Sequence, residues 1–354
     1  MRRLAAIVAM LAAAWSCSPG ADRSLDELTS WSFDSATIVP ADRSLARPES
    51  GAALADDRLI AADQIHGLRA IEPDGSSRPF GRLADAGYVH EPPARPGGAN
   101  GVSLEPGGTH LLVCDVFTGA IYRVDAATEA TDLLYTHPFG INVVRRDRTG
   151  AIWFTQSTEN SGAESQSRLF AALDVPSSDG ALFRIAPARA GEPLPAPDRV
   201  VGGLYFANGL AIDEDTGHLY LAETTQNRVL AFHVGAATGE LSDRRVVANV
   251  LTPDNLDVDD DGLLWIASPV RNEVVVVGPQ SGRTRAVFRA GTAENDRIAA
   301  EWLRRGEAGE PRLELLGPAL WAPLPGLVTG VILTPGDGPV YLTGVGDALV
   351  RLPR

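Results

Sequence analysis

Five segments of the chain place an acidic or carboxamide side chain directly before a run of apolar residues. Carboxylate and amide oxygens are the ligands that hard divalent cations prefer, and calcium takes six to eight of them. Zinc prefers His or Cys ligands, and the sequence contains no CxxC or HExxH spacing. If the five segments meet, they predict a site for calcium or another hard divalent cation. These positions are Glu49, Asn100, Asn142, Asn208 and Asp254-Asn255.

The same residue types have an ordinary alternative explanation. Asn-Gly and Asp-Asn pairs form turns, and a loop that enters a strand often contains them. A single copy would favour a turn, but five copies in the same phase, two of them with acids, favour a site. The acidic run Asp257 to Gly262 lacks the ligand spacing of a helix-loop-helix calcium loop, so we interpret it as an ordinary acidic turn.

These residues recur because the sequence contains an internal repeat. Each copy has a polar residue, an apolar strand, a turn, a second strand, a charged turn and a third strand. Five copies begin at residues 49, 100, 142, 208 and 254, and a sixth includes Gly330 to Leu333. A unit of about 40 to 50 residues with insertions is the period of a propeller blade. We therefore predict an all-β fold, a six-bladed β-propeller over residues 45–354, with one rim of its channel formed by the first residue of each copy.

The sixth copy ends with its third strand near Arg354, so we expect a strand around residues 31–40 to complete the last blade. Two insertions interrupt the repeat. Residues 156–180 include an expected short helix at Ser167 to Leu173. Residues 293–305 are also expected to be helical, with Ile298, Trp302 and Leu303 on one side. Such insertions either shape a pocket on one face or are surface decoration.

The N-terminus has the pattern of an export signal. Arg2-Arg3 precedes the apolar run Leu4 to Ala14, which is too short to span a bilayer. Residues 14–18 resemble a bacterial lipobox, so residues 1–17 are expected to be a signal peptide, with lipid attached at Cys17; an ordinary cleaved signal is the alternative. Residues 18–44 are expected to form a polar tether and the first strand. The protein would then be exported to the periplasm or cell surface.

The overall charge restricts the kinds of partner. A formal net charge of -14 disfavours nucleic acids and anionic membrane surfaces, apart from a lipid anchor. The acidity suits a cation site, although simple solubility explains it equally well. Cys114 lies in an apolar strand and is expected to be an inert core residue. We expect a monomer that acts on a small molecule.

Several segments together resemble the gluconolactonase, regucalcin and luciferin-regenerating-enzyme family, with similarity to paraoxonases and strictosidine-synthase-like proteins. The resemblance covers roughly residues 45–354. It implies that Glu49, Asn142, Asn208 and Asp254 bind the metal and that Asn255 is a further ligand. Asn100 stands where the paraoxonase branch has a functional His. The segments are Pro48 to Ser50, Ile141-Asn142, Phe206 to Ile212, Ala222 to Arg228 and Pro253 to Val258.

The resemblance implies calcium-dependent hydrolysis of a lactone or related ester. The bound cation would polarise the carbonyl, with Asp254 as the candidate base and His137 as a second candidate. The sequence contains no Gly-x-Ser-x-Gly motif that would favour a covalent route. Two alternatives remain open: a non-catalytic propeller that binds a small ligand or protein, and a strictosidine-synthase-like activity.

Overall fold

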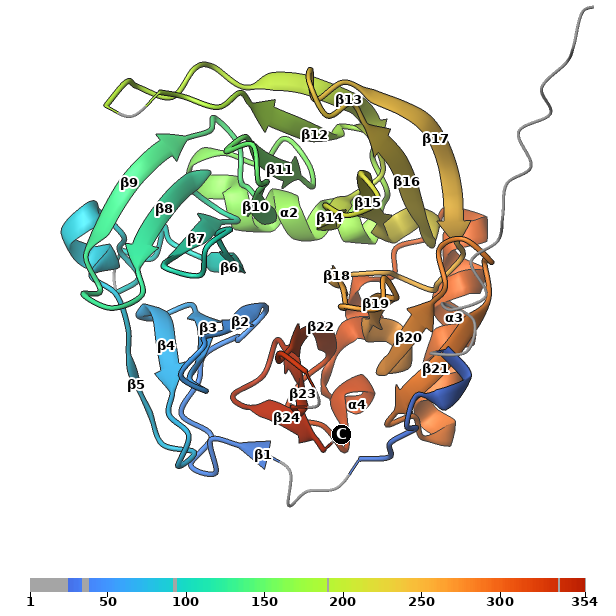
Figure 1. Ribbon diagram of the computed structural model, residues 1–354. Coiled ribbons are helices and arrows are strands. Elements are labelled where there is room, and N and C mark those ends of the chain that lie inside the picture. The colour runs from blue at the N-terminus through green and yellow to red at the C-terminus, as the bar shows by residue number, and fades with distance from the viewer. Residues whose placement is uncertain (1–24, 34–37, 92–93, 190, 337, 354) are drawn as a thin grey trace, which may run out of the picture.

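Six four-stranded antiparallel sheets form a ring around a central channel (Figure 1). The structure is a computed structural model that describes residues 25–33, 38–91, 94–189, 191–336 and 338–353. The predicted six-bladed β-propeller is therefore confirmed. The predicted signal peptide and Cys17 lie outside the described residues.

The strands of blades I to V follow one another in chain order from the channel outward. Blade I contains β2 (Gly51–Ala53), β3 (Leu59–Asp63), β4 (Gly67–Ile71) and β5 (Ser77–Pro79); blade II contains β6 (Ala99–Leu104), β7 (His110–Asp115), β8 (Ala120–Asp125) and β9 (Thr131–Thr136). Blade III contains β10 (Val143–Arg146), β11 (Ile152–Gln156), β12 (Gly180–Ile185) and β13 (Asp198–Leu204); blade IV contains β14 (Ala207–Asp213), β15 (His218–Glu223), β16 (Arg228–Val234) and β17 (Leu241–Ala248). Blade V contains β18 (Leu256–Val258), β19 (Leu264–Ser268), β20 (Glu273–Val277) and β21 (Thr284–Arg289); blade VI contains β22 (Val328–Leu333), β23 (Val340–Gly344), β24 (Leu349–Leu352) and β1 (Ile38–Val39).

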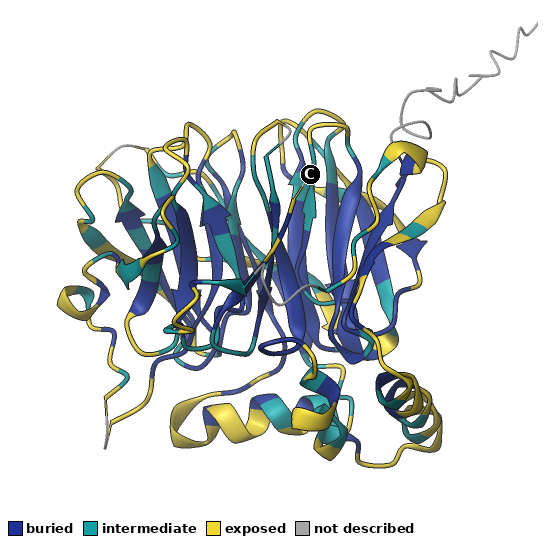
Figure 2. Cartoon of the chain, turned by 90° about the horizontal axis from the view of Figure 1, so that it is seen from below, coloured by how far each residue is buried: buried dark blue, intermediate teal, exposed yellow. Residues whose placement is uncertain are grey.

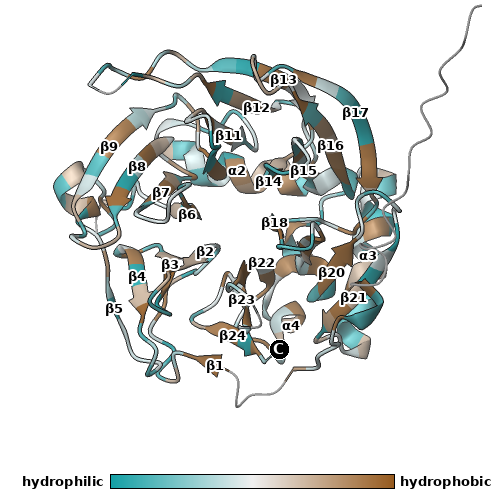
Figure 3. Ribbon diagram, in the orientation of Figure 1, coloured by the Kyte–Doolittle hydropathy of each residue, from teal (hydrophilic) through white to brown (hydrophobic). Residues whose placement is uncertain are grey.

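The hydropathy of each strand follows its place in the blade. Every residue of β20, the outer of the two middle strands of blade V, is buried, and four of its five residues are Val. The outermost strand β17 has five consecutive exposed residues. Figure 3 shows β20 mostly in the brown of hydrophobic residues, whereas β17 includes hydrophilic residues in teal. A middle strand is covered on both faces by the neighbouring blades, whereas an outermost strand has a solvent face, which explains the difference.

The first described residues close the ring. β1 pairs with β24, with Ile38 opposite Val350, so a segment near the N-terminus supplies the outermost strand of blade VI. This confirms the strand expected within residues 31–40. Leu25 is fully buried in the core between blades V and VI, and Trp31 packs against the same cluster. The closing segment is therefore anchored by side chains as well as by backbone hydrogen bonds.

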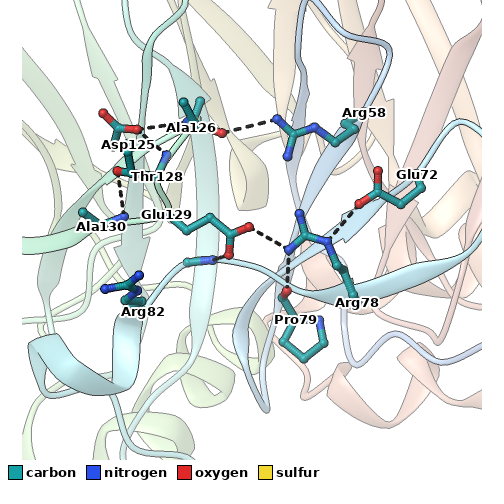
Figure 4. A network of polar contacts seen from close by, with 12 residues as sticks. Arg58, Glu72, Arg78, Pro79, Arg82, Asp125, Ala126, Thr128, Glu129 and Ala130 are labelled. Atoms are coloured by element: carbon teal, nitrogen blue, oxygen red, sulfur yellow. Dashed lines mark hydrogen bonds and ion pairs between the residues drawn. The ribbon is translucent and has the colours of Figure 1, made fainter.

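Polar contacts join the outer strands of blades I and II (Figure 4). The Arg78 guanidinium lies 2.7 Å from Glu129 and 3.0 Å from Glu72. Arg58 Nη2 donates to the backbone carbonyl of Ala126 at 3.3 Å. These groups are partly exposed, so the apolar cluster beneath them contributes most of the stability of this seam.

The longer helices gather on one face of the disc, and their outer surfaces are exposed (Figure 2). They occupy the two predicted insertions, and a capping box of Thr292 and Asn295 begins the longest one. Ile298 and Trp302 are buried as expected, but Leu303 is 37% exposed because it lies one position off that face. None of the described helices is long and apolar enough to cross a membrane. The helices are α2 (Ser165–Asp174), α3 (Ala293–Ala308), α4 (Pro318–Trp321), and the short η2 (Leu83–Ala86), η3 (Gly162–Glu164), η4 (Thr224–Gln226), η5 (Pro269–Arg271) and η6 (Leu313–Leu316).

Candidate metal and substrate site

The predicted ring of polar residues meets at the rim of the channel that the helices cover. A cavity of about 510 Å³ lies there, within the usual range for small-molecule sites. Five of the predicted rim residues line it: Glu49, Asn100, Asn142, Asn208 and Asp254.

Backbone bulges direct the rim side chains of three blades. The pairing registers of β6, β14 and β22 with their neighbours shift at the rim, where Asn100, Asn208 and Thr329 stand. A bulge inserts an extra residue and re-aims its side chain. Asn100 and Asn208 thus lie inside strands, and their Asn-Gly pairs are bulges rather than turns.

The glycines after these asparagines allow neighbouring inner strands to approach closely. A Cβ atom on Gly209 would lie 2.3 Å from the carbonyl oxygen of Asp254, and one on Gly101 would lie 2.7 Å from that of Asn142. Real Cβ atoms do not come so near to backbone oxygens. Glycine therefore sets the spacing between consecutive rim residues.

Hydrogen bonds fix the orientation of the carboxamides. Asn142 Nδ2 donates to Ser157 Oγ at 3.0 Å, and Asn208 Nδ2 donates to Thr224 Oγ1 at 3.1 Å. Asn100 Nδ2 donates to both the backbone carbonyl and Oδ1 of Asn142, at 3.0 and 3.2 Å. In this network Asn208 Oδ1 has no donor, and Asn142 Oδ1, which accepts from Asn100, has one further lone pair for a ligand at the site.

Two features of the ring fit a divalent cation. Asn208 Oδ1 is buried and has no hydrogen-bond partner, which is costly unless a ligand satisfies it. Burial raises the pKa of Asp254 well above its ordinary value, and the nearby Glu49 carboxylate raises it further. A cation between these oxygens would offset both costs. Among the described residues there is no cluster of three or more His, Cys, Asp and Glu, so the oxygens of Asn would have to complete the ligand set.

The backbone of Glu49 is held by residues of the neighbouring blade VI and of blade V. Its carbonyl oxygen accepts hydrogen bonds from Asn255 Nδ2 at 3.1 Å, Thr329 Oγ1 at 3.1 Å and Thr343 Oγ1 at 2.8 Å. Blades V and VI thereby position the acid of blade I. Asn255 was expected as a further ligand, but it does not line the cavity, and its amide acts on the Glu49 backbone instead.

Arg47 places one positive charge at the cavity wall. Its Nη2 atom lies 2.7 Å from Glu49 Oε1, and both side chains line the cavity. A cation bound at the ring would therefore share the Glu49 carboxylate with Arg47.

His137, the second candidate base, does not line the cavity. It is buried among aromatic rings, 4.7 Å from Phe183 and 5.1 Å from Phe154 between centroids. Its Nε2 lies 3.0 Å from Gln156 Oε1, and burial lowers its pKa. The structure thus gives His137 a place in the blade core, away from the substrate cavity.

The acidic turn lies at the opposite end of β18 from the rim. Asp259 Oδ1 accepts hydrogen bonds from the backbone N–H groups of Asp261 and Leu263. Asp259 Oδ2 accepts a hydrogen bond from Trp265 Nε1. These bonds close an ordinary turn, as expected.

Cys114 is fully buried, and burial raises the pKa of its thiol, as expected of an inert core residue.

Several cavity residues were not found from the sequence. Thr329 occupies the rim position of blade VI, and its place before Gly330 matches the Asn-Gly phase of blades II and IV. Arg47, Thr224 and Thr252 also line the cavity, and the sequence around them has no comparable repeat signal. The phase of the repeat was the signal that could have found Thr329.

The fold and the site define a six-bladed propeller with an oxygen-rich ring at one end of its channel. Residues 135–295 match the family model described as SMP-30/Gluconolactonase/LRE-like region. The matched region covers all the strands of blades III to V and includes Asn142, Asn208 and Asp254.

Solved structures share the fold. A gluconolactonase from Xanthomonas campestris aligns with a TM-score of 0.58 and 22% identity, covering 88% of this chain and 87% of that one. Regucalcin from Agrobacterium tumefaciens, a calcium-binding protein, aligns with a TM-score of 0.61 and 14% identity, covering 92% and 95%. At these identities the likeness shows the propeller fold.

The curated relatives match shorter segments. Strictosidine synthase-like 13 of Arabidopsis thaliana is 28% identical over 165 residues, which cover 45% of this chain and 38% of that protein. Hemomucin, an adipocyte plasma membrane-associated protein of Drosophila melanogaster, is 26% identical over 178 residues, 47% of this chain and 29% of that protein. The chain thus spans well under half the length of the curated relatives that it matches.

Proposed function

We propose that the protein is a calcium-dependent hydrolase of lactones or related esters. The observation that supports this most directly is the unpartnered Asn208 Oδ1 in the ring that also contains Glu49 and Asp254. The match to a gluconolactonase-like region and the calcium-binding regucalcin fold give the same indication.

The residues that would hold the cation are Glu49, Asn142, Asn208 and Asp254. When bound, a calcium ion supplies Lewis-acid polarisation of a carbonyl oxygen. The Nδ2 bonds of Asn142 and Asn208 hold their Oδ1 atoms in place before any ligand arrives. This preorganisation removes the cost of orienting the ligands during binding.

Asp254 is the candidate general base. Burial and the neighbouring Glu49 raise its pKa in the absence of a cation, and a cation at the ring would favour the ionised carboxylate, which is the form that accepts a proton. One carboxylate oxygen can face the ring while the other receives the proton of an attacking water.

The proposal is tested with the purified protein on a panel of lactones and aryl esters. We expect turnover with calcium present, loss of turnover after chelation with EDTA, and recovery after calcium is restored. Turnover that is unaffected by complete metal removal would contradict the proposal.

The second candidate is a non-catalytic propeller that binds a small ligand and uses the cation for stability. No histidine of the described residues lines the cavity, which favours this candidate. It would be supported if EDTA lowered only the melting temperature and no member of the panel were hydrolysed.

A further inference from the structure

The part of the cavity farthest from the ring is formed by the two insertions that interrupt the blade repeat. α2 contributes Leu169, Phe170 and Leu173 to the wall. The second insertion contributes its apolar residues from α3, η6 and α4. These are Trp302, Leu313, Leu316 and Trp321.

Residues of the propeller loops continue this apolar surface toward the ring. Phe206, Val270 and Leu327 line the cavity between the cap and the polar floor. The cavity therefore has two regions: a polar region at the rim, lined by side-chain oxygen atoms, and an apolar region toward the helices, lined by carbon atoms. A ligand that fills it must have one polar end and one apolar end.

Two polar groups of the cap that line the cavity already have partners within the cap. Glu314 is an exposed residue, and its carboxylate pairs with Arg305 at 2.8 Å. Trp321 Nε1 donates to the Leu316 carbonyl at 3.0 Å. Trp302 Nε1 is buried without a partner, and it offers a single donor.

From this division we propose that the cavity selects a lactone or ester with a long apolar acyl or alkyl group over a polyhydroxylated lactone. The inference rests on the proposed function and names its substrate class. A sugar-type lactone would bring several hydroxyl groups against a wall that cannot bond them, and each unpaired hydroxyl weakens binding. An alkyl chain would instead exchange water for Leu, Phe and Trp side chains.

A series of lactones with one ring and a growing alkyl chain tests the proposal. We expect kcat/KM to rise about fourfold for each added methylene until the cavity is full. A polyhydroxylated lactone of the same ring size is expected to be the poorest substrate. A kcat/KM that is flat with chain length, or highest for the polyhydroxylated lactone, would overturn the substrate class while leaving lactone hydrolysis intact.

A pair of variants on the same insertion locates the selectivity. Phe170→Ser removes an apolar wall residue, so we expect it to lower kcat/KM for the long-chain lactone by about tenfold or more and to lower it less for the unsubstituted lactone. Val175→Ser is the matched control, because Val175 is 54% exposed and does not line the cavity. Equal losses in the two variants would contradict a selective wall.

A binding measurement separates this inference from the proposed function. Lactams with the same alkyl series cannot be hydrolysed in the assay, and their binding is measured by isothermal titration in the presence of calcium. If affinity rises with chain length but no lactone is hydrolysed, the proposed hydrolase function is contradicted and the inferred preference for an apolar ligand is supported. Affinity that does not rise with chain length would overturn the inference whether or not hydrolysis occurs.

Discussion

Asp254 is the residue at which the proposed cation site is most directly tested. Asp254→Asn keeps the shape and removes the charge, so we expect cation affinity to fall by at least about 100-fold, since even residues behind a ligand cost 10- to 100-fold when changed. Calcium binding is measured by isothermal titration together with the lactonase rate. Asp261→Asn is the matched control, because Asp261 is exposed in the turn at the other end of the blade. Full metal occupancy in Asp254→Asn would contradict the proposal that Asp254 is a ligand of the cation.

His137 gives a prediction that does not depend on the metal. Burial lowers its pKa in the folded protein, whereas the unfolded chain takes up a proton near pH 6.5. Below that pH the unfolded state binds more protons, so this histidine's contribution to stability is present above about pH 6.5 and is lost as the pH falls.

We therefore expect His137→Gln to lose less stability than the parent protein between pH 6.5 and pH 5. Chemical denaturation at several pH values in excess EDTA measures this difference. His66→Gln is the control, since it makes the same substitution at an exposed histidine. Identical profiles for His137→Gln and the parent protein would show that His137 is not held neutral by burial.

At the scale of elements, the Asn-Gly bulges set the distance between neighbouring rims. Gly209→Ala would force a Cβ atom against the Asp254 carbonyl, so we expect a loss of about 1–3 kcal/mol in stability and weaker calcium binding. Thermal unfolding and calcium titration are measured on the same sample. Gly291→Ala is the control, because its nearest neighbour is the movable Arg289 side chain. Unchanged calcium affinity in Gly209→Ala would show that the ring tolerates a wider spacing.

The repeat phase allowed the blades and most rim residues to be predicted from the sequence. The blades repeat because every sheet must bury both faces, and this requirement leaves a periodic pattern of apolar strands. Thr329 has the same phase but was missed, since threonine in an apolar strand is unremarkable by composition. His137 was expected near the rim from its place before Gly140, and the sequence does not reveal that four aromatic rings surround it. Arg47 was missed for a related reason, because its pairing with Glu49 depends on the fold around the rim.

At the scale of the whole molecule, stability depends on the segment that closes the ring. A chain that begins at residue 41 lacks β1, Leu25 and Trp31, which together bury apolar surface on blades V and VI. Losing two large apolar side chains costs about 3–6 kcal/mol, and we expect the melting temperature to fall by on the order of 10 °C. Differential scanning calorimetry measures the change.

A chain that begins at residue 25 is the matched control for this truncation, since it keeps the closing segment. Light scattering of the shorter chain adds a second readout, because an uncovered β24 edge favours association between chains. Equal melting temperatures for the two chains would contradict a stabilising role for ring closure.

The bonds that hold Glu49 also affect how the protein must be synthesised. The side chains of Thr329 and Thr343, which fix the Glu49 carbonyl, are synthesised 280 and 294 residues after Glu49. Blades I to III can begin to fold during synthesis, yet the acid of the first blade has no fixed position until blade VI has been translated and docked. A prematurely terminated chain would therefore lack the complete ring, and calcium binding would distinguish finished molecules from unfinished ones.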